Sequence, residues 1–326
     1  MRRLLAALAA LAVIAAVAGG GAWYARRRYV APGPLAAARD VVVPPGTIRS
    51  IGAVLKREGV IANPLWFRAA AELTSRQGPL RAAEFAFPAH ASLAAVLGVL
   101  RHARPVEHPV TIAEGLTAAA IARELAATPF LAGPAPVPPE GAVLPQTYDV
   151  TLGTPRTALL ARAEAAMRTT LARVWAGRAP DLPLTSPEQL LTLASIVERE
   201  TALPAERAHI AGVFINRLRL GMPLQSDPTV AYAVSGGQAI DGATLTTADL
   251  RVASPYNTYR VKGLPPGPIC SPGLASLQAA AHPLATKDLY FVANGTGGHA
   301  FAATLAQHDI NVAHWRALQK SSSGGR

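Results

Sequence analysis

Residues 4–24 constrain the chain more than any other segment, because this run carries no charged side chain. A helix that crosses a bilayer needs about 20 consecutive apolar residues, so the run is long enough to span a membrane. Arginines flank it on both sides, at positions 2–3 and 26–28, so the positive-inside rule leaves its orientation open. We expect residues 1–30 to form a cytoplasmic stub and a transmembrane anchor. The alternative is a cleaved signal peptide, since Ala16-Val17-Ala18 has the pattern of a cleavage site.

Composition limits what the remaining residues can do. The net charge is +11, and a basic chain attracts anionic partners such as nucleic acid, anionic lipid or an acidic polymer. The positive charge is spread along the chain and forms no basic stripe interleaved with aromatic residues, so we expect no nucleic-acid partner. Cys270 is the single cysteine and the histidines are scattered, a pattern without the ligand spacing of a metal site. We therefore expect neither a metal nor another cofactor.

Helical and strand-like segments follow the apolar run without a regular βαβ order, which predicts the α+β class. Proline-rich stretches near residues 128–140 and 180–183 are typical of connections. A strand followed by a turn is expected at 41–48. Further strands are expected at 106–112, 289–293 and 299–303, and the last two should pair as a hairpin around a glycine-rich turn. The tail 321–326 is expected to be disordered.

One helix is marked with particular clarity. Ser186 is a typical N-cap, Pro187 suits the first helical position, and Gln189 closes a capping box. The run that follows is almost continuously apolar until Glu198. An apolar setting disfavours the ionised form of a carboxyl group, so we expect Glu198 to hold a proton that it can donate as a general acid.

Helical periodicity separates Glu198 from the nearby Glu200. At about 100° per residue, Glu198 shares its face with the small residues Ala194 and Ser195, which would leave room for a ligand. Glu200 lies on the opposite side among bulky residues, which suggests packing or a salt bridge. The alternative for both glutamates is a structural ion pair with Arg199, Arg207 or Arg217, since such networks also perturb carboxyl groups.

Three loops carry polar and aromatic side chains that suit a carbohydrate ligand, because amides bind hydroxyl groups and rings cover sugar faces. One loop holds an amide and a carboxylate in a proline turn, the next holds two tyrosines and an amide, and the third, 263–269, is rich in proline. The alternative is that the aspartate and the asparagine only stabilise their own turns. The candidate residues in these loops are Gln225, Asp227, Tyr256, Asn257 and Tyr259.

Taken together, seven segments of the chain resemble the YceG-like family of endolytic murein transglycosylases. The order and spacing of these segments are similar to the family from about residue 41 to about residue 318. The matching segments are Ala194-Ser195-Ile196-Val197-Glu198-Arg199-Glu200-Thr201, Val213-Phe214-Ile215-Asn216-Arg217-Leu218, Leu224-Gln225-Ser226-Asp227-Pro228-Thr229-Val230, Tyr256-Asn257-Thr258-Tyr259, Gly263-Leu264-Pro265-Pro266-Gly267-Pro268-Ile269, Tyr290-Phe291-Val292-Ala293 and Gly297-Gly298-His299-Ala300-Phe301.

The resemblance implies a domain organisation and a location. It implies a single-pass protein of the inner membrane whose bulk faces the periplasm. After the anchor it implies a LysM-like subdomain at 38–106, a connecting α/β region at 107–185 and a catalytic domain at 186–320. The implied partners are peptidoglycan glycan strands, the inner membrane, peptidoglycan synthases, and division or elongation proteins.

The resemblance also implies a chemistry in which Glu198 is the catalytic acid. The enzyme would cleave the bond between N-acetylmuramic acid and N-acetylglucosamine and leave a 1,6-anhydromuramyl end. Asn216 is a further candidate for sugar contact, and His299 would either line the cleft or stabilise its turn. Two alternatives stay open: a lysozyme-like hydrolase in which Asp227 activates water, and a non-catalytic protein that binds the cell wall as a scaffold.

Overall fold

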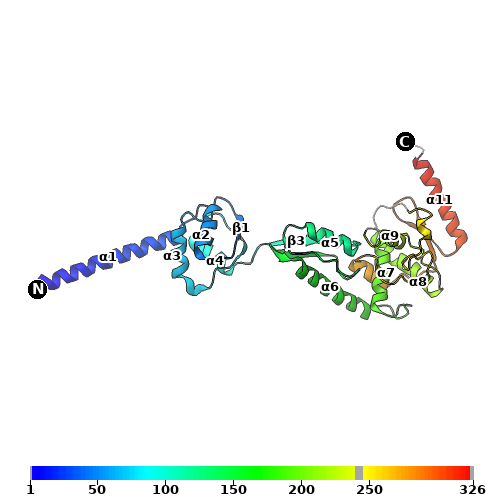
Figure 1. Cartoon of the computed structure of the whole chain (residues 1–326), viewed down its shortest axis with the longest axis horizontal. Helices are drawn as coiled ribbons and strands as arrows, with labels where there is room; N and C mark the ends of the chain where they lie inside the picture. The colour runs from blue at the N-terminus through cyan, green and yellow to red at the C-terminus, as the bar shows by residue number, and fades with distance from the viewer. Residues whose placement is uncertain (1, 239–244, 324–326) are drawn as a thin grey trace. The chain divides into compact units, whose positions relative to one another are not determined.

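A computed structural model describes residues 2–238 and 245–323 of the chain. They form two compact units, Met1–His108 and Pro109–Arg326. Helices and short strands are mixed in both units, as the α+β prediction requires (Figure 1).

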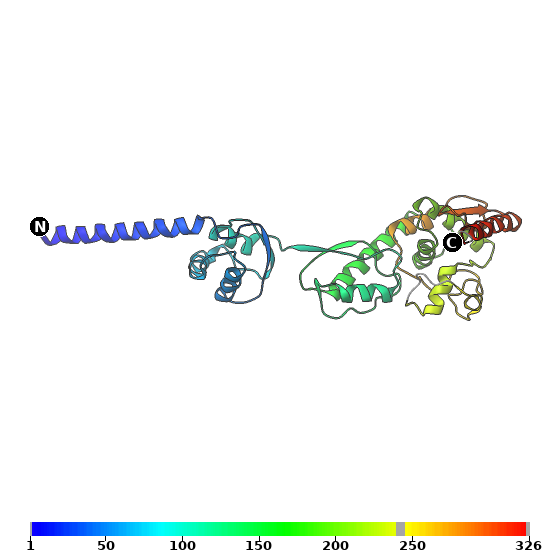
Figure 2. The same cartoon turned by 90° about the horizontal axis from the view of Figure 1, so that it is seen from above.

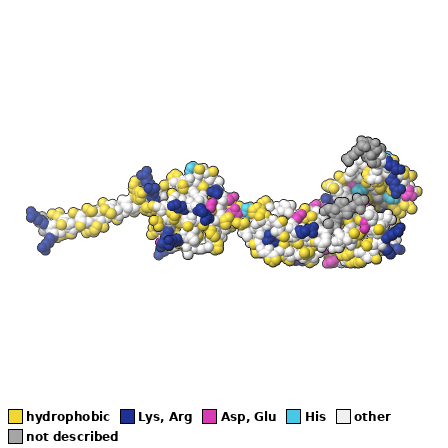
Figure 3. Space-filling view, turned by 45° about the horizontal axis from the view of Figure 1, so that its top comes forward, with side chains coloured by type: hydrophobic (Ala, Val, Ile, Leu, Met, Phe, Trp, Pro, Cys, Tyr) yellow, Lys and Arg dark blue, Asp and Glu magenta, His cyan; other side chains and the backbone are white. Residues whose placement is uncertain are grey.

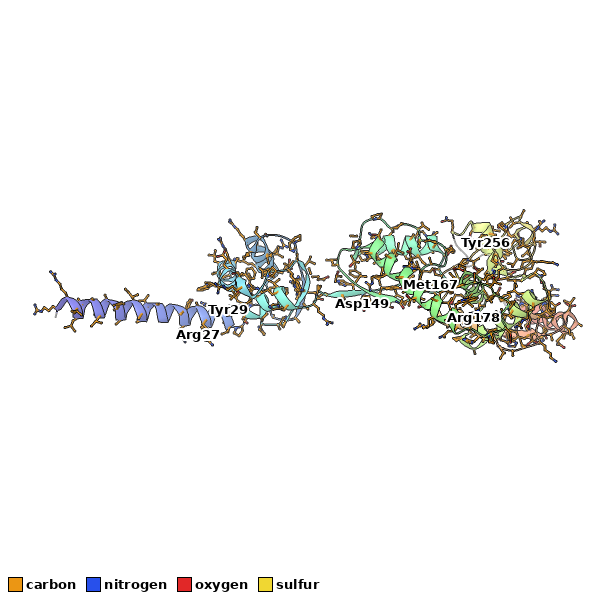
Figure 4. The ribbon with its side chains drawn as sticks, turned by 90° about the horizontal axis from the view of Figure 1, so that it is seen from below. Arg27, Tyr29, Asp149, Met167, Arg178 and Tyr256 are labelled. Atoms are coloured by element: carbon orange, nitrogen blue, oxygen red, sulfur yellow. The ribbon has the colours of Figure 1, made fainter. Side chains whose placement is uncertain are left out.

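Helix α1 (Arg2–Val30) opens the first unit and contains the predicted apolar run. Its length and composition are sufficient to cross a membrane, although a signal sequence would share both properties. Basic side chains gather at its two ends and apolar side chains cover the stretch between them (Figure 3). Arg27 and Tyr29 lie at its C-terminal end (Figure 4), where Tyr29 packs against the core of the first unit.

The rest of the first unit is a two-stranded sheet with helices between and after its strands. Strand β1 pairs antiparallel with β2, so that Val41 lies opposite Phe85. Val41 and Val43 are buried whereas Val42 is half exposed, which is the two-residue alternation of a strand with one covered face. The elements are β1 (Arg39–Val43), α2 (Ile48–Arg57), α3 (Pro64–Leu73), η1 (Ser75–Gln77), β2 (Ala83–Phe87) and α4 (Leu93–His102).

The second unit begins with short strands and two helices that enclose a separate core. Strand β3 pairs with β5, and β4 pairs in parallel with β6. Leu159 and Leu160 of α6 face this core, while Met167 on the same helix faces the next one (Figure 4). The elements are β3 (Glu107–Thr111), α5 (Ala118–Ala127), β4 (Leu131–Ala132), β5 (Thr147–Thr151), β6 (Thr154–Pro155) and α6 (Arg156–Ala176).

A helical core completes the second unit. Helix α7 packs against α10, α8, α6 and α9, and is therefore surrounded by other elements along most of its length. The elements are α7 (Pro187–Glu200), η2 (Pro204–Glu206), α8 (Arg207–Arg219), α9 (Asp227–Ser235), η3 (Asp249–Arg251) and α10 (Leu274–Ala281). Figure 2 shows the same helices from above.

The predicted hairpin is present, since β7 (Tyr290–Ala293) pairs antiparallel with β8 (His299–Ala302). Helix α11 (Leu305–Ser323) packs against both strands. It corrects the expected tail, because residues 321–323 are helical and residues 324–326 lie outside the described residues. Neither glycine nor proline interrupts the chain before Gly324, so the helix can continue through the serines.

Candidate active site

Helix α7 holds the predicted acid in its last turn. The backbone N–H of Gln189 donates to Ser186 Oγ at 3.3 Å, and Pro187 occupies the first turn, as predicted. The capping box differs slightly, because Gln189 Oε1 accepts from the backbone of Thr185 instead of Ser186. Residues 190–197 are buried without interruption, so packing fixes the position of Glu198 at the helix end.

The carboxyl group of Glu198 is buried and makes two polar contacts. Its side chain is 6% exposed. The backbone N–H of Gly273 donates to Oε2 at 2.9 Å, and Arg207 Nη2 lies 3.4 Å from Oε1. The ion pair with Arg207, one of the alternatives from the sequence, is therefore present. Both contacts place a hydrogen-bond donor or a positive charge against the carboxyl group, while the enclosure removes it from solvent.

The small residues beside Glu198 do not border an open space. Ala194 and Ser195 are both fully buried. Ser195 Oγ accepts a hydrogen bond from the backbone N–H of Ile269 at 3.1 Å, and Cys270 Sγ contacts the Ser195 carbonyl oxygen. The segment before α10 fills the room that the sequence analysis assigned to a ligand, because small side chains also allow close backbone approach.

Glu114 is a second carboxylate beside Glu198, and the sequence analysis did not select it. Its Oε2 lies 3.7 Å from Arg207 Nη2, and its side chain is 46% exposed. Partial burial and then the charge of Glu198 raise the pKa of Glu114, while Arg207 opposes the rise. The sequence signal was the Glu114-Gly115 turn between a strand and a helix, but nothing local connected that turn to Glu198.

Glu200 belongs to a different cluster. The hydroxyl group of Ser226 donates a short hydrogen bond to Glu200 Oε1. Burial raises the pKa of Glu200 to about 7, the bond from Ser226 opposes the rise, and the charge of Asp227 adds to it. Arg217 lies close enough to lower the pKa in turn. The sequence analysis expected packing or a salt bridge around Glu200. The structure places Glu200 in a buried polar cluster with Ser226, Asp227 and Arg217.

Asp227 lies in the Glu200 cluster. Tyr259 donates its hydroxyl proton to Asp227 Oδ1 at 2.6 Å. Gln225, in the same loop, is exposed, and its Oε1 accepts from Arg217 Nη1 at 3.2 Å. The backbone of Gln225 is left-handed with φ of 50°, which is strained for a residue with a side chain. These contacts fix the orientation of the loop that carries Gln225 and Asp227.

The two candidate asparagines use their amides within the protein. Asn257 is fully buried, and its Nδ2 donates to the carbonyl oxygens of Leu250 and Val252. Asn216 Nδ2 donates to the carbonyl oxygens of Thr286 and Asp288 at 2.9 and 3.1 Å. Both amides stabilise loops, which is the alternative the sequence left open for Asn257. This engagement argues against direct contact with a sugar.

The remaining candidates are partly accessible. The rings of Tyr256 and Tyr232 lie 4.9 Å apart, and Tyr256 is partly exposed (Figure 4). His299 Nδ1 lies 2.7 Å from Glu206 Oε2, and its backbone N–H donates to Glu206 Oε1. Burial alone would raise the pKa of Glu206, but these contacts with His299 hold it below its usual range. His299 therefore anchors the β7–β8 turn to η2.

Metal ligands do not gather in the part of the chain that the structure describes. Within residues 2–238 and 245–323, no group of three or more His, Cys, Asp or Glu side chains is close enough to hold an ion. Cys270 is a buried free thiol.

Comparison with known proteins gives consistent matches. The sequence profile of the YceG-like family matches residues 41–314. An endolytic murein transglycosylase of Bacillus subtilis is 48% identical over 124 residues, which are 38% of this chain and 33% of that protein. One of Streptococcus pneumoniae is 38% identical over 177 residues, 53% of this chain and 32% of its own length. This chain thus spans about one third of the length of these curated relatives.

A solved structure matches over a larger share of the fold. The crystal structure of a yceG-like protein from Listeria monocytogenes superposes with a TM-score of 0.54 at 28% sequence identity. The match covers 84% of this chain and 98% of that one.

Proposed function

This chain belongs to the YceG-like family, and from that premise we propose that it is a lytic transglycosylase acting inside peptidoglycan glycan strands. The bond cleaved is the β-1,4 link between N-acetylmuramic acid and N-acetylglucosamine. The observation that carries the proposal is the environment of Glu198: an enclosed carboxyl group with one N–H donor and one guanidinium group beside it. A carboxyl group in such a setting can donate a proton and later accept one.

In the first step, Glu198 gives its proton to the bridging oxygen while the bond from that oxygen to C1 of the muramyl sugar breaks. The N-acetylglucosamine unit leaves as an alcohol, and positive charge develops on the muramyl ring. Glu198 becomes a carboxylate. The N–H of Gly273 at Oε2 and Arg207 at Oε1 stabilise the charge that appears there.

In the second step, the Glu198 carboxylate takes the proton of the C6 hydroxyl group of the same muramyl sugar. The C6 oxygen forms a bond with C1 and closes the 1,6-anhydro ring. Glu198 regains its proton, so atoms and charge balance over the cycle. Water takes no part, and a carboxylate that activates water, as in an inverting glycosidase, is not required.

Substrate contacts are proposed for the accessible candidates. Tyr256 and Tyr259 offer ring faces to a sugar, and Gln225 offers an amide on an exposed loop. Asp227 and His299 are proposed to orient hydroxyl or amide groups of the sugar. The engaged amides of Asn216 and Asn257 are assigned to support of the loops that carry these side chains.

The first unit is proposed to anchor the enzyme and to hold the glycan. Helix α1 would span the inner membrane, with the rest of the chain in the periplasm. Residues 38–106 would form the LysM-like subdomain, which is supported by a core of their own around Phe67, Phe85 and Phe87. Peptidoglycan synthases and division or elongation proteins are the proposed protein partners. Termination of nascent strands is the proposed role.

The test is mass spectrometry of purified glycan strands after incubation with the full chain in lipid nanodiscs. The unchanged chain and the control Glu124→Gln, an exposed carboxyl on α5, should release anhydro-ended fragments. Glu198→Gln should release none. Fragments heavier by one water would instead indicate a hydrolase, and no cleavage by the unchanged chain would favour the wall-binding scaffold.

A further inference from the structure

Two glycines allow Glu114 to approach Glu198. A Cβ atom on Gly273 would lie 1.8 Å from Glu114 Oε1, so the carboxyl group of Glu114 rests directly against this glycine. Gly115 has φ of +77°, and a Cβ there would lie 3.1 Å from Arg199 Nη1 and 3.7 Å from Glu198 Cγ. The carboxyl group of Glu114 can therefore rest against the start of α10 because Gly273 lacks a side chain, and the turn at Gly115 adopts a left-handed conformation that favours glycine.

Backbone hydrogen bonds fix this turn in place. The N–H of Gly115 donates to the carbonyl oxygen of Ser271 at 2.9 Å, and the N–H of Ser271 donates to Leu116 at 2.9 Å. Gly273, two residues further, donates to Glu198. The same short segment thus holds the Glu114 turn on one side and the Glu198 carboxyl on the other.

Arg207 is shared between the two carboxyl groups. The same atom, Nη2, lies 3.4 Å from Glu198 and 3.7 Å from Glu114. Its Nε is buried and has no hydrogen-bond partner among the described residues, and the guanidinium group contacts both carboxyl groups through Nη2. Two negative groups beside one positive group carry a net charge of −1, and a single proton neutralises the cluster.

We propose that Glu114 is a positioning residue for Glu198: it draws Arg207 from the Glu198 carboxyl group and, through its own negative charge, favours retention of the proton that Glu198 donates. This inference rests on the proposed transglycosylase function and adds a second carboxylate to it. Glu114 is half exposed whereas Glu198 is enclosed, so solvent reaches the Glu114 carboxyl group while Glu198 faces Gly273 and Arg207.

Other charged groups near this cluster are engaged elsewhere. Arg199 donates to the carbonyl oxygen of Gly115, and Glu206 is bound by His299. Asp227 accepts from Tyr259, and Arg217 donates to backbone carbonyls that include that of Leu289. Helix α10 carries no charged side chain. The coupling therefore involves Glu114, Glu198 and Arg207.

The first test measures the electrostatic coupling between Glu114 and Glu198 and does not depend on enzymatic activity. The full chain in nanodiscs is labelled with ¹³C at its glutamate carboxyl carbons, and the Glu114 signal is identified by its loss in Glu114→Gln. Because the charge of Glu198 raises the pKa of Glu114, we expect Glu114 to titrate lower in Glu198→Gln, by roughly one pH unit. Glu200→Gln, which neutralises the other glutamate of the same helix turn, should leave the Glu114 midpoint unchanged. An unchanged midpoint in Glu198→Gln would overturn the proposal.

The second test measures its consequence for cleavage. Glu114→Gln removes the negative charge and gives Arg207 wholly to Glu198, so Glu198 should lose its proton at lower pH. We expect the rate of anhydro-fragment release to fall about tenfold at pH 8 and less than about twofold at pH 5.5. Glu114→Asp should recover part of the loss, and Glu124→Gln should show none.

Equal losses at both pH values, or no loss, would overturn the role of Glu114. If the unchanged chain released no anhydro-ended fragments, the proposed activity would fail while the carboxyl titration would still decide whether the two groups are coupled. The two failures are therefore distinguishable.

Discussion

Glu198 and Glu200 lie in the same turn of α7, yet they occupy two unlike surroundings. Glu198 contacts the backbone N–H of Gly273 before α10 and the guanidinium group of Arg207, whose Nε has no hydrogen-bond partner among the described residues. Glu200 accepts a hydrogen bond from the hydroxyl group of Ser226. Ser226 lies in the loop that carries Asp227, which accepts a hydrogen bond from Tyr259. An offset of two residues turns a side chain by about 200° around a helix, so each glutamate meets a different set of loops.

The difference shows that the helix fixes the direction in which each glutamate side chain points, while the loops that each side chain meets determine its polar contacts. Both carboxyl groups lie at the C-terminal end of α7, where the helix dipole disfavours negative charge. At Glu198 the backbone N–H of Gly273 before α10 and the guanidinium group of Arg207, which Glu198 shares with Glu114, compensate for this. At Glu200 burial dominates and raises the pKa to about 7. We assign catalysis to the first glutamate and loop support to the second.

Replacement of Arg207 by glutamine should have the largest effect on the Glu198 side. It removes the cation that both Glu198 and Glu114 share, so the charge formed in the first step loses its stabilisation. We expect kcat to fall by about 10²- to 10³-fold, measured as the release of anhydro-ended fragments. A change at the exposed end of the same helix α8, Arg219→Gln, serves as control and should leave kcat within about twofold. An equal loss of kcat in Arg207→Gln and Arg219→Gln would contradict a specific role for Arg207 at Glu198.

Glu200→Gln should act on stability instead, and in a pH-dependent way. The usual pKa of 4.5 describes the unfolded chain, and about 7 describes the folded chain. Between these values the folded chain retains a proton that the unfolded chain has lost, so the contribution of this group to stability falls as pH rises through that window. At pH 8 the neutral variant should be more stable by about 3 kcal/mol, and near pH 4.5 equally stable. Thermal unfolding followed by tryptophan fluorescence at the two pH values measures this; a destabilised variant at pH 8 would refute it.

Gly273→Ala should reproduce the loss of Glu114. The new Cβ would lie 1.8 Å from Glu114 Oε1, and the flexible carboxyl end can move aside while the backbone stays in place. We expect a rate loss of about tenfold at pH 8, with a change in unfolding free energy of about 1 kcal/mol. Gly98→Ala on α4, where a Cβ meets nothing within 4 Å, is the matched control. If the pH dependence of the cleavage rate were unchanged in Gly273→Ala, the position of Glu114 would not affect catalysis and the proposed role of Glu114 would be contradicted.

Ser226→Ala should have the smallest effect and should be confined to the Glu200 cluster. The hydroxyl group stabilises ionised Glu200, so its removal should cost about 1 kcal/mol at pH 8 and less at pH 5. The rate of cleavage should stay within about twofold of the unchanged chain. A clear rate loss at constant stability would connect Ser226 to catalysis and weaken the contrast between the two glutamates.

Local signals in the sequence were sufficient for most elements but not for the relations between them. Ser186 and Pro187 defined the start of α7, and the glycine-rich turn defined the β7–β8 hairpin. The segment 224–229 was interpreted as a proline turn. A proline directly after Asp227 also suits the start of a helix, and α9 begins at Asp227.

The site was predictable where it depended on one element. Glu198 was selected because α7 alone reveals its apolar setting. Glu114 was not, because its approach depends on two distant glycines and on a backbone segment before α10. The burial of Asn257 could not be foreseen either, since an amide in a polar loop is equally compatible with a sugar or with its own backbone.

The most direct measurement compares glycan cleavage by Glu198→Gln and Glu200→Gln, both in the full chain in nanodiscs at pH 6, with folding checked by thermal unfolding. We expect anhydro-ended fragments from Glu200→Gln at a rate near that of the unchanged chain and none from Glu198→Gln. Cleavage by Glu198→Gln, together with its loss in a folded Glu200→Gln, would contradict the assignment of the chemistry to Glu198.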